Sequence, residues 1–367
     1  MSLAKFKLFI IMGTRPEIIK LSPVLRELKN QNFNYEIVFT DQHYDSVLSK
    51  NFFNELKLDK PKYYLKIGRE NPASQTANAI IGIEKILKKH TPDLVLVQGD
   101  TNSSLAGALT AVKLSIKLGH IEAGLRSYDL RMPEEHNRRM IDHISNFLFA
   151  PTEDTVNTLK KENVWGKIVL TGNTIIDACK QNLEYALKKS KIMLEIPFKK
   201  FILVTTHRAE NVDDPLILKQ IIDSFLEIPF PIVFPMHPRT LNRLKKFNLY
   251  KLMQNSNILI MPPVGYFDFL NLIYHSYLII TDSGGIQEES TAPEIKKYTI
   301  VIRKTSDRIE SCKTGFSIVV GTEKDQIVNE VLKFIKNPPE LPNKSPFGDG
   351  NASKRIISFI KKEFKIE

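Results

Sequence analysis

Short apolar, β-branched segments alternate with longer amphipathic segments along the chain, and this pattern restricts the fold more than any other feature. Continuous apolar strands are typical of a parallel sheet that is covered by helices on both faces, and their alternation with helices indicates βαβ units. Helical periodicity is found over Glu17–Lys29 and Thr76–Lys89. The predicted strands of the first half are Lys7–Met12, Tyr35–Thr40, Leu94–Gln98, Gly119–Glu122, Phe147–Pro151 and Ile168–Thr171.

The same pattern then starts again. The predicted strands of the second half are Phe201–Thr206, Pro231–Pro235, Asn257–Met261, Leu278–Thr281, Thr299–Ile302 and Ser317–Val320. We therefore expect an α/β protein with two doubly wound, Rossmann-like parallel-sheet domains at 1–175 and 176–350. Residues 351–367 are expected to form a helix that packs back on the N-terminal domain. Ligands of such sheets bind beyond the carboxyl ends of the strands, so a site in a central cleft is predicted.

Composition and length exclude several classes of protein. The chain has 367 residues, of which 42% are hydrophobic and 25% charged, as in an ordinary globular protein of two domains. No apolar run reaches the roughly 20 residues of a membrane span, and Leu8–Met12 is too short for a signal peptide. Cys179 and Cys312 lack zinc or Cys-x-x-Cys spacing, and no His-Glu-x-x-His motif is present. We predict a cytoplasmic protein with no membrane partner, no metal and no cofactor.

The net charge of +11 is a feature that nucleic-acid-binding proteins often share. The lysines are scattered in pairs over segments with helical periodicity, where solvated helix faces are the usual explanation. No nucleic-acid-binding module is recognisable, so no nucleic-acid partner is predicted, and a nucleic-acid binder would depend on charge alone. A positive field also favours the capture of an anionic, diphosphate-bearing substrate.

Charged residues follow the first predicted strand in Gly13-Thr14-Arg15-Pro16-Glu17-Ile18-Ile19-Lys20. Glycine permits a tight turn, and Pro16 with Glu17 suits the first turn of a helix, whose free N–H groups attract anions. Arg15 and Lys20 add positive charge nearby. A plain turn with basic surface residues is the alternative. The segment is neither Gly-x-Gly-x-x-Gly nor a P-loop, so NAD and ATP are not favoured.

Three carboxylates, Asp100, Glu122 and Glu134, follow strands or lie just beyond them. We expect them to meet at one edge of the sheet, where Glu122 faces a low dielectric. Carboxylates that share a site separate in proton affinity, so one can act as an acid and another as a base. Such a group suits proton abstraction from carbon. Asp100 could alternatively be a helix N-cap. All three could also form an ion-pair network with Arg126, Arg138 and Arg139.

Two motifs of the second half also follow strands. His207 lies beside Arg208 at the end of the first strand, and such a histidine is either functional or part of the core. The second motif is Thr281-Asp282-Ser283-Gly284-Gly285-Ile286-Gln287-Glu288-Glu289. Backbone N–H groups of residues 283–285 are suited to a diphosphate, and Glu289, one turn later, to sugar hydroxyls. Aromatic residues in Val264–Phe269 either stack on a base or pack in the core.

With these segments in view, the chain resembles the non-hydrolysing UDP-N-acetylglucosamine 2-epimerases, which have the GT-B fold. The sequences of its motifs are most similar to those of archaeal members. Order and spacing of the motifs make the resemblance specific over nearly the full length. The matching segments are Gly13–Lys20, Gln98–Asp100, Glu122–Arg126, Pro133–Arg138, Thr171–Asp177, His207-Arg208, Thr281–Glu289 and Phe347–Gly350.

The resemblance implies an isomerase that binds UDP-N-acetylglucosamine (UDP-GlcNAc) and UDP. The sugar loses a proton at carbon 2 and UDP at carbon 1, giving 2-acetamidoglucal. UDP then adds back, and the proton returns to the opposite face, giving UDP-N-acetylmannosamine (UDP-ManNAc) for polysaccharide or glycan precursors. The implied catalytic residues are Asp100, Glu122, Glu134 and His207. The implied substrate-binding residues are Arg15, Lys20, Arg138, Phe269, Ser283, Gly284, Gly285, Glu289 and Arg308.

The resemblance also implies a homodimer and, in some members, activation by a second UDP-GlcNAc. The matching positions for that second site are Gln42, His43, Arg208 and His237. The chain departs from the family pattern at Arg308-Ile309-Glu310, where the family has proline in place of Ile309. A free backbone N–H and a looser φ at this position are expected to shift Arg308.

Alternative functions remain open from the sequence. A hydrolysing epimerase would share the site and release free N-acetylmannosamine. A GT-B glycosyltransferase would need an acceptor groove. A nucleotide-sugar-binding protein without catalytic activity is compatible with the altered Arg308 segment.

Overall fold

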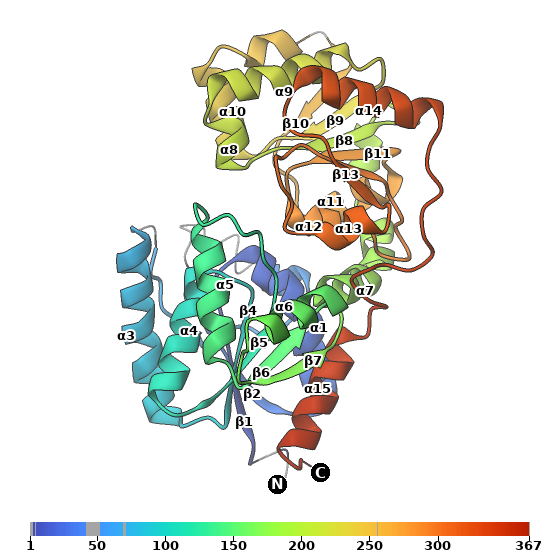
Figure 1. Ribbon diagram of the computed structural model, residues 1–367. Coiled ribbons are helices and arrows are strands. Elements are labelled where there is room, and N and C mark those ends of the chain that lie inside the picture. Colours follow the sequence, from blue (N-terminus) through green and yellow to red (C-terminus); the bar gives the residue numbers. More distant parts are fainter. Residues whose placement is uncertain (1–2, 4, 42–51, 69–70, 255, 367) are drawn as a thin grey trace. The chain divides into compact units, whose positions relative to one another are not determined.

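The computed structural model describes residues 3, 5–41, 52–68, 71–254 and 256–366 (Figure 1). They form two compact units. Unit 1 comprises Met1–Ala178 and Gly348–Glu367, and unit 2 comprises Cys179–Phe347. The division between them falls within helix α7 (Thr174–Lys189).

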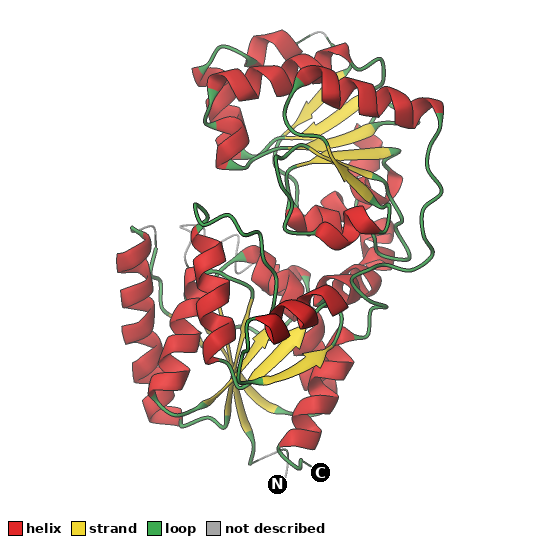
Figure 2. Ribbon diagram, in the orientation of Figure 1, coloured by secondary structure: helices red, strands yellow, loops and turns green. Residues whose placement is uncertain are grey.

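Unit 1 is built around a seven-stranded parallel sheet with the order β3-β2-β1-β4-β5-β6-β7. Helices cover both faces of this sheet, as expected for strands that are apolar throughout (Figure 2). The strands are β1 Lys7–Met12, β2 Asn34–Phe39, β3 Tyr63–Tyr64, β4 Leu94–Gln98, β5 Lys117–Ile121, β6 Phe147–Ala150 and β7 Lys167–Leu170. The helices are α1 Arg15–Asn30, α3 Pro72–His90, α4 Asn102–Lys113, α5 Pro133–Ile144, α6 Glu153–Lys161 and α15 Ala352–Glu363.

Unit 2 contains a six-stranded parallel sheet with the order β10-β9-β8-β11-β12-β13. Its strands are β8 Ile202–Thr205, β9 Ile232–Pro235, β10 Ile258–Met261, β11 Leu278–Thr281, β12 Thr299–Val301 and β13 Ser317–Val319. Its helices are α8 Ala209–Val212, α9 Pro215–Glu227, α10 Pro238–Lys246, α11 Tyr266–His275, α12 Gly284–Glu289, α13 Ile309–Lys313 and α14 Lys324–Lys336, with 3-10 turns at Ile192–Glu195 and Tyr250–Met253.

The predicted strands agree with the structure to within two residues at each end, and the predicted α/β class with two doubly wound parallel sheets is confirmed. The pattern missed β3, because two residues are too short to show periodicity. The central strands β4 and β11 are buried along their whole length, in keeping with their continuous apolar sequences. Each buried Val, Ile or Leu side chain contributes about 1.5–3 kcal/mol, so these strands dominate the two cores.

The strand order of each sheet reverses at one position, and that position is where a doubly wound sheet binds its ligand. In unit 1 the reversal lies between β1 and β4, so the turns at Gly13-Thr14 and Gly99-Asp100 flank it. In unit 2 it lies between β8 and β11, and the turns after Thr205 and Thr281 flank it. Sequence motifs singled out above therefore occupy both reversal points.

The C-terminal helix α15 belongs to unit 1 and packs against α1 (Figure 1). The Asp177 carboxylate fixes its first turn by accepting hydrogen bonds from Ala352 N (3.0 Å), Ser353 N (2.8 Å) and Ser353 Oγ (2.7 Å). An aromatic contact between Phe6 and Phe364, with 4.8 Å between ring centroids, secures its far end.

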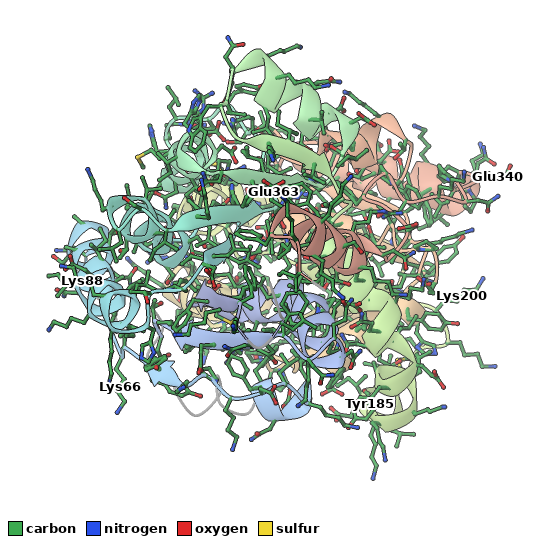
Figure 3. All side chains as sticks on the ribbon, turned by 90° about the horizontal axis from the view of Figure 1, so that it is seen from below. Lys66, Lys88, Tyr185, Lys200, Glu340 and Glu363 are labelled. Atoms are coloured by element: carbon green, nitrogen blue, oxygen red, sulfur yellow. The ribbon has the colours of Figure 1, made fainter. Side chains whose placement is uncertain are left out.

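Lysines from several elements point outward. Lys66, Lys88 and Lys200, which come from distant parts of the sequence, are all exposed and project from the ribbon (Figure 3). Lys88 lies on α3, as expected for a solvated helix face, whereas Lys66 and Lys200 lie outside helices. Within the described residues, no helix combines the length and the apolar character needed to cross a bilayer.

Candidate active site

The turn after β1 is held by a buried carboxylate. Glu17, which is 1% exposed, lies in the first turn of α1. Its Oε2 accepts hydrogen bonds from Gly13 N (3.0 Å) and Thr14 Oγ1 (2.7 Å), and its Oε1 from Thr101 Oγ1 (2.9 Å) and Ser104 Oγ (3.0 Å). Burial raises the pKa of Glu17 even though these four bonds lower it. One side chain thus joins the turns that follow β1 and β4.

Asp100 follows β4 and faces a cation. Its Oδ2 lies 2.8 Å from a guanidinium nitrogen of Arg138, which is buried on α5. Asn137, the preceding residue of α5, donates a hydrogen bond of 2.9 Å to the backbone carbonyl of Asp100. The alternative role as an N-cap is not observed, because Thr101 is the N-cap of α4. The Asp100 side chain is therefore paired with Arg138 and only partly buried.

Glu122 follows β5 in a strained conformation. Its φ is +72°, which a residue other than glycine rarely adopts and which is often found at functional sites. The Lys20 ammonium forms a buried ion pair with Glu122, and Gln98 donates a hydrogen bond of 3.0 Å to it. Lys20, predicted from the resemblance to hold phosphate, is here the counter-ion of a carboxylate. Arg15 instead is exposed, with its guanidinium carbon 5.7 Å from the ring centroid of Phe52.

The adjacent residues Glu134 and Glu135 differ sharply. Glu135 is fully buried and accepts hydrogen bonds from Ser127 N (2.8 Å) and Oγ (2.9 Å) and from Arg139 Nε (3.1 Å). Glu134 is half-buried, and within the described residues its carboxylate forms no hydrogen bond or ion pair. Glu135 therefore stabilises the start of α5, whereas Glu134 remains available for chemistry.

The three candidate carboxylates do not form one ion-pair network with the three arginines. Arg138 does pair with Asp100. Arg126 instead pairs with Asp142 at 2.7 Å and with Glu162 at 2.6 Å, and Arg139 pairs with Glu135.

In unit 2 a single carboxylate organises the reversal point. Asp282 is fully buried after β11 and accepts hydrogen bonds from Thr206 Oγ1 (2.7 Å), His207 N (2.9 Å), Arg208 N (2.9 Å) and Asn211 Nδ2 (3.0 Å). It therefore joins the turn after β8 to the turn after β11, as Glu17 does in unit 1. The His207 ring nitrogen Nδ1 also lies 3.3 Å from Asp282.

His207 and His237 lie together at the ends of β8 and β9, with 5.3 Å between their ring centroids. Burial lowers the pKa of both, and Asp282 only partly offsets this effect. His237 also caps α10, because its Nδ1 accepts a hydrogen bond of 3.1 Å from Arg239 N. Both rings therefore favour the neutral form, in which a nitrogen can accept a proton.

Helix α12 begins directly after the second reversal turn. Ser283 is its N-cap, with Gly284 and Gly285 as its first residues. A Cβ added to Gly284 would be in ordinary van der Waals contact with Asp307 at 3.4 Å and Arg308 at 3.6 Å, so the start of α12 lies close to both side chains. Glu289, predicted to bind the ribose, is 7% exposed at the other end of α12. Phe269 lies half-buried on α11, where both stacking and core packing remain possible.

Arg308 is firmly anchored despite its unusual neighbour. It is 6% exposed, forms an ion pair with the buried Glu288, and lies 3.0 Å from Asp307 Oδ2. Ile309 is the first residue of α13 and is 45% exposed. Its N–H belongs to the first turn, where no helical acceptor exists. Proline and isoleucine at this position therefore leave the hydrogen bonds within the helix the same.

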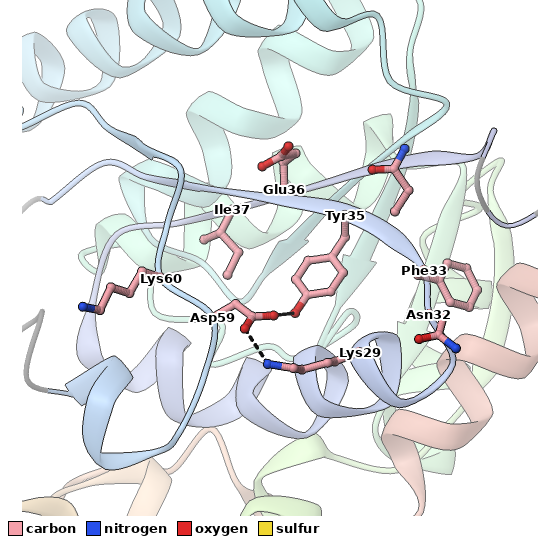
Figure 4. A pocket seen from close by; sticks show the side chains of 9 residues that line it. Lys29, Asn32, Phe33, Tyr35, Glu36, Ile37, Asp59 and Lys60 are labelled. Atoms are coloured by element: carbon pink, nitrogen blue, oxygen red, sulfur yellow. Dashed lines mark hydrogen bonds and ion pairs between the residues drawn. The ribbon is translucent and has the colours of Figure 1, made fainter.

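Other parts of the structure contribute less to the site. A hollow of about 450 Å³ is lined by Lys29, Tyr35 and Asp59, whose side chains meet in Figure 4. It lies at the amino end of β2, away from the carboxyl ends where the candidate residues gather. Gln42 and His43 lie outside the described residues. Among the residues that are described, no cluster of His, Cys, Asp and Glu is arranged to hold a metal ion.

Sequence reasoning missed the residues that hold these turns in place. Glu17 carried a readable signal, since Thr14-x-x-Glu17 has the spacing of a capping box. Asp282 lay within a recognised motif, but its role depends on partners more than 70 residues away in sequence. Glu288 gave no local signal, because its partner Arg308 comes from another loop.

Two doubly wound parallel sheets, with charged and glycine-rich turns at their reversal points, define a GT-B-type protein. The sequence pattern of the UDP-N-acetylglucosamine 2-epimerase family matches residues 26–361, and the chain belongs to this family. It is 46% identical to the UDP-N-acetylglucosamine 2-epimerase of Methanocaldococcus jannaschii over 364 residues, which cover 96% of this chain and 98% of the relative.

A solved structure of the M. jannaschii UDP-GlcNAc 2-epimerase in complex with UDP-GlcNAc and UDP superposes with a TM-score of 0.90. The identity is 46%, and the match covers 97% of this chain and 100% of that chain. A Pseudomonas aeruginosa relative with a different substrate, UDP-2,3-diacetamido-2,3-dideoxy-D-glucuronate 2-epimerase, is 37% identical over 97% of this chain and 99% of its own. The relatives of this chain are therefore named for more than one nucleotide-sugar substrate.

Proposed function

We propose that this protein interconverts UDP-GlcNAc and UDP-ManNAc. The observation that carries the proposal is the pair of carboxylates at neighbouring strand ends in unit 1. Asp100 and Glu122 follow β4 and β5, and each faces a buried cation. The 46% identity to a UDP-N-acetylglucosamine 2-epimerase supports this substrate over the diacetamido-glucuronate derivative.

The proposed reaction follows the non-hydrolysing route. A carboxylate takes the proton from sugar carbon 2, the bond from carbon 1 to the diphosphate oxygen breaks, and a double bond forms between carbons 1 and 2. UDP and 2-acetamidoglucal are the bound intermediates. UDP adds back at carbon 1, and a proton is delivered to the opposite face of carbon 2. Two acid/base groups on opposite faces are required, which one carboxylate alone cannot supply.

We assign the proton transfers to unit 1 and the binding of UDP to unit 2. In unit 1, the candidate acid/base groups are Asp100, Glu122 and Glu134, the last of which has no side-chain partner in the described part of the chain. In unit 2, the start of α12 with Arg308 would bind the diphosphate, since N–H groups and a guanidinium both stabilise phosphate charge. His207 lies beside Asp282, which directly precedes the N-cap of α12, and burial favours its neutral form. The homodimer, the cytoplasmic location and the role in polysaccharide precursors stay predictions.

The test is incubation of the purified protein with UDP-GlcNAc in deuterated buffer, followed by proton NMR. We expect a mixture with UDP-ManNAc and deuterium at carbon 2 of both sugars. Release of free N-acetylmannosamine and UDP would indicate the hydrolysing route instead. Binding of UDP without any exchange would contradict the proposal and favour a nucleotide-sugar-binding protein.

A further inference from the structure

A second group of charged residues in unit 1 is buried behind the candidate carboxylates. His120 and Asp142 are both 0% exposed, and His120 Nδ1 lies 2.7 Å from Asp142 Oδ1. Asp142 Oδ2 lies 2.7 Å from Arg126 and accepts a hydrogen bond of 3.1 Å from Gly124 N. Arg126 in turn donates to both carboxylate oxygens of Glu162, at 2.9 and 2.6 Å.

Hydrogen bonds link this group to the turn after β4, and its cations hold Asp142 in the ionised form. His120 Nε2 lies 2.8 Å from the Gly99 carbonyl, which can only accept, so Nε2 carries a hydrogen. Burial raises the pKa of Asp142, but His120 and Arg126 outweigh it and hold the pKa below its usual value. The Asp142 carboxylate thus faces the His120 ring, the Arg126 guanidinium and the Gly124 N–H, and Arg126 continues the network to Glu162.

Stability alone does not explain why His120, Asp142 and Arg126 are buried together. Replacement of buried ion pairs by apolar residues of similar volume is often neutral or stabilising. The groups that the network contacts indicate another role. Gly99 directly precedes Asp100, and Gly124 is two residues after Glu122. Both glycines have positive φ, +68° and +87°, so both turns have special backbone geometry that must be held.

Helix α5 connects this network to the third carboxylate. Glu134, Arg138 and Asp142 are spaced four residues apart on α5, so they lie along one face of the helix. Arg138 on this face pairs with Asp100, and Asp142 binds His120 and Gly124. The same face thus contacts the turns after β4 and β5 and carries Glu134 at its first turn.

We propose that Asp142 and His120 are positioning residues that hold α5 in register with the turns after β4 and β5. In this way, they set the placement of Asp100, Glu122 and Glu134 relative to one another. The inference depends on the proposed function, because it assigns its consequence to those carboxylates. Neither Asp142 nor His120 contacts the substrate in this assignment, and both act through the backbone and helix that they bind.

The test compares Asp142→Asn with Asp177→Asn. Asp177 is a matched control, because it is also a fully buried carboxylate of unit 1 that accepts backbone N–H bonds, yet it anchors α15. We expect Asp142→Asn to lower kcat roughly 10²-fold, the effect of misplacing reacting groups by about 1 Å, with KM and UDP affinity at wild-type values. Asp177→Asn should lower Tm but leave kcat unchanged wherever the protein remains folded.

A measurement that does not use turnover separates this inference from the proposed function. Amide hydrogen exchange in Asp142→Asn should accelerate in residues 99–104 and 122–126, whereas Asp177→Asn should accelerate it at the start of α15.

The outcomes are distinguishable. A wild-type protein that turns nothing over would overturn the proposed function, and the exchange results would still decide the role of Asp142. Normal kcat in a folded Asp142→Asn variant, or unchanged exchange in residues 99–104 and 122–126, would overturn the positioning role.

Discussion

The two units have the same strand order around their reversal points but use their buried carboxylates differently. In unit 1, Glu17 holds the backbone turns, while Asp100 and Glu122 present side chains that face Arg138 and Lys20. Two buried carboxylates of unit 2, Asp282 and Glu288, instead act as support.

In unit 2, Asp282 binds N–H groups of the turn after β8, and Glu288 pairs with Arg308. The groups that we expect to bind UDP there are the N–H groups at the start of α12, Arg308 and Glu289. In the proposed assignment, one fold thus supplies proton-transfer chemistry in unit 1 and anion binding in unit 2. Substitutions in unit 1 should therefore lower turnover, and those in unit 2 should weaken UDP binding.

The largest effect is expected for Asp100→Asn. The amide keeps the shape of the side chain but cannot take a proton, so turnover should fall roughly 10²–10⁴-fold, the usual contribution of a general acid or base. UDP affinity, measured by calorimetry, should stay unchanged. Glu153→Gln, an exposed carboxylate of the same unit, is the control and should turn over normally. Unchanged turnover in Asp100→Asn would remove Asp100 from the chemistry.

Asp282→Asn and Glu17→Gln test the comparison directly. Asp282→Asn replaces one acceptor oxygen with a donor facing N–H groups, so we expect about 3–5 kcal/mol lower stability in urea unfolding, together with weaker UDP binding. Glu17→Gln should lower turnover but leave UDP affinity unchanged. If both variants bind UDP equally well, the division of roles between the units is wrong.

Much of this comparison could be predicted from sequence, for a physical reason. Asp100, Glu122, His207 and Asp282 each follow an apolar strand, and in a parallel sheet every strand ends at the same edge. Local pattern was therefore sufficient to place them at the right edge.

Pairing could not be predicted in the same way. Lys20 and Glu122 are 102 residues apart, and the sequence does not show which cation faces which carboxylate. Glu134 and Glu135 have nearly the same sequence context, yet one is buried among donors and the other is not. A helix turns by about 100° per residue, so only the packed position of α5 separates them.

Two histidines of unit 2 should contribute to the pH dependence of stability. Burial lowers the pKa of His207 and His237 in the folded protein. As pH falls below about 6.5, the unfolded chain binds protons that the folded histidines resist, so stability falls with pH. Urea unfolding at about pH 7.5 and about pH 5.5 should show a smaller loss in His207→Gln than in wild type. An identical loss would mean that His207 does not titrate in this range.

The smallest effect is expected for Ile309→Pro, which restores the family residue. Proline suits the first helical position and stabilises by about 0.4–1 kcal/mol through the unfolded chain. Against this, Arg308 has ψ of 54°, whereas a residue before proline prefers about +120° to +160°. The two effects should nearly cancel. Arg308 should stay in place because Glu288 and Asp307 hold its guanidinium.

UDP affinity is the decisive measurement for this variant. Arg308→Lys keeps the charge but loses the planar fork that bonds two oxygens at once, so UDP binding should weaken about tenfold, or roughly 1.4 kcal/mol. Ile309→Pro should bind UDP like the wild type. If it weakens binding as much as Arg308→Lys, then the backbone of this loop, rather than the ion pairs with Glu288 and Asp307, sets the position of Arg308. Anion binding in unit 2 would in that case depend on loop geometry as much as on buried carboxylates.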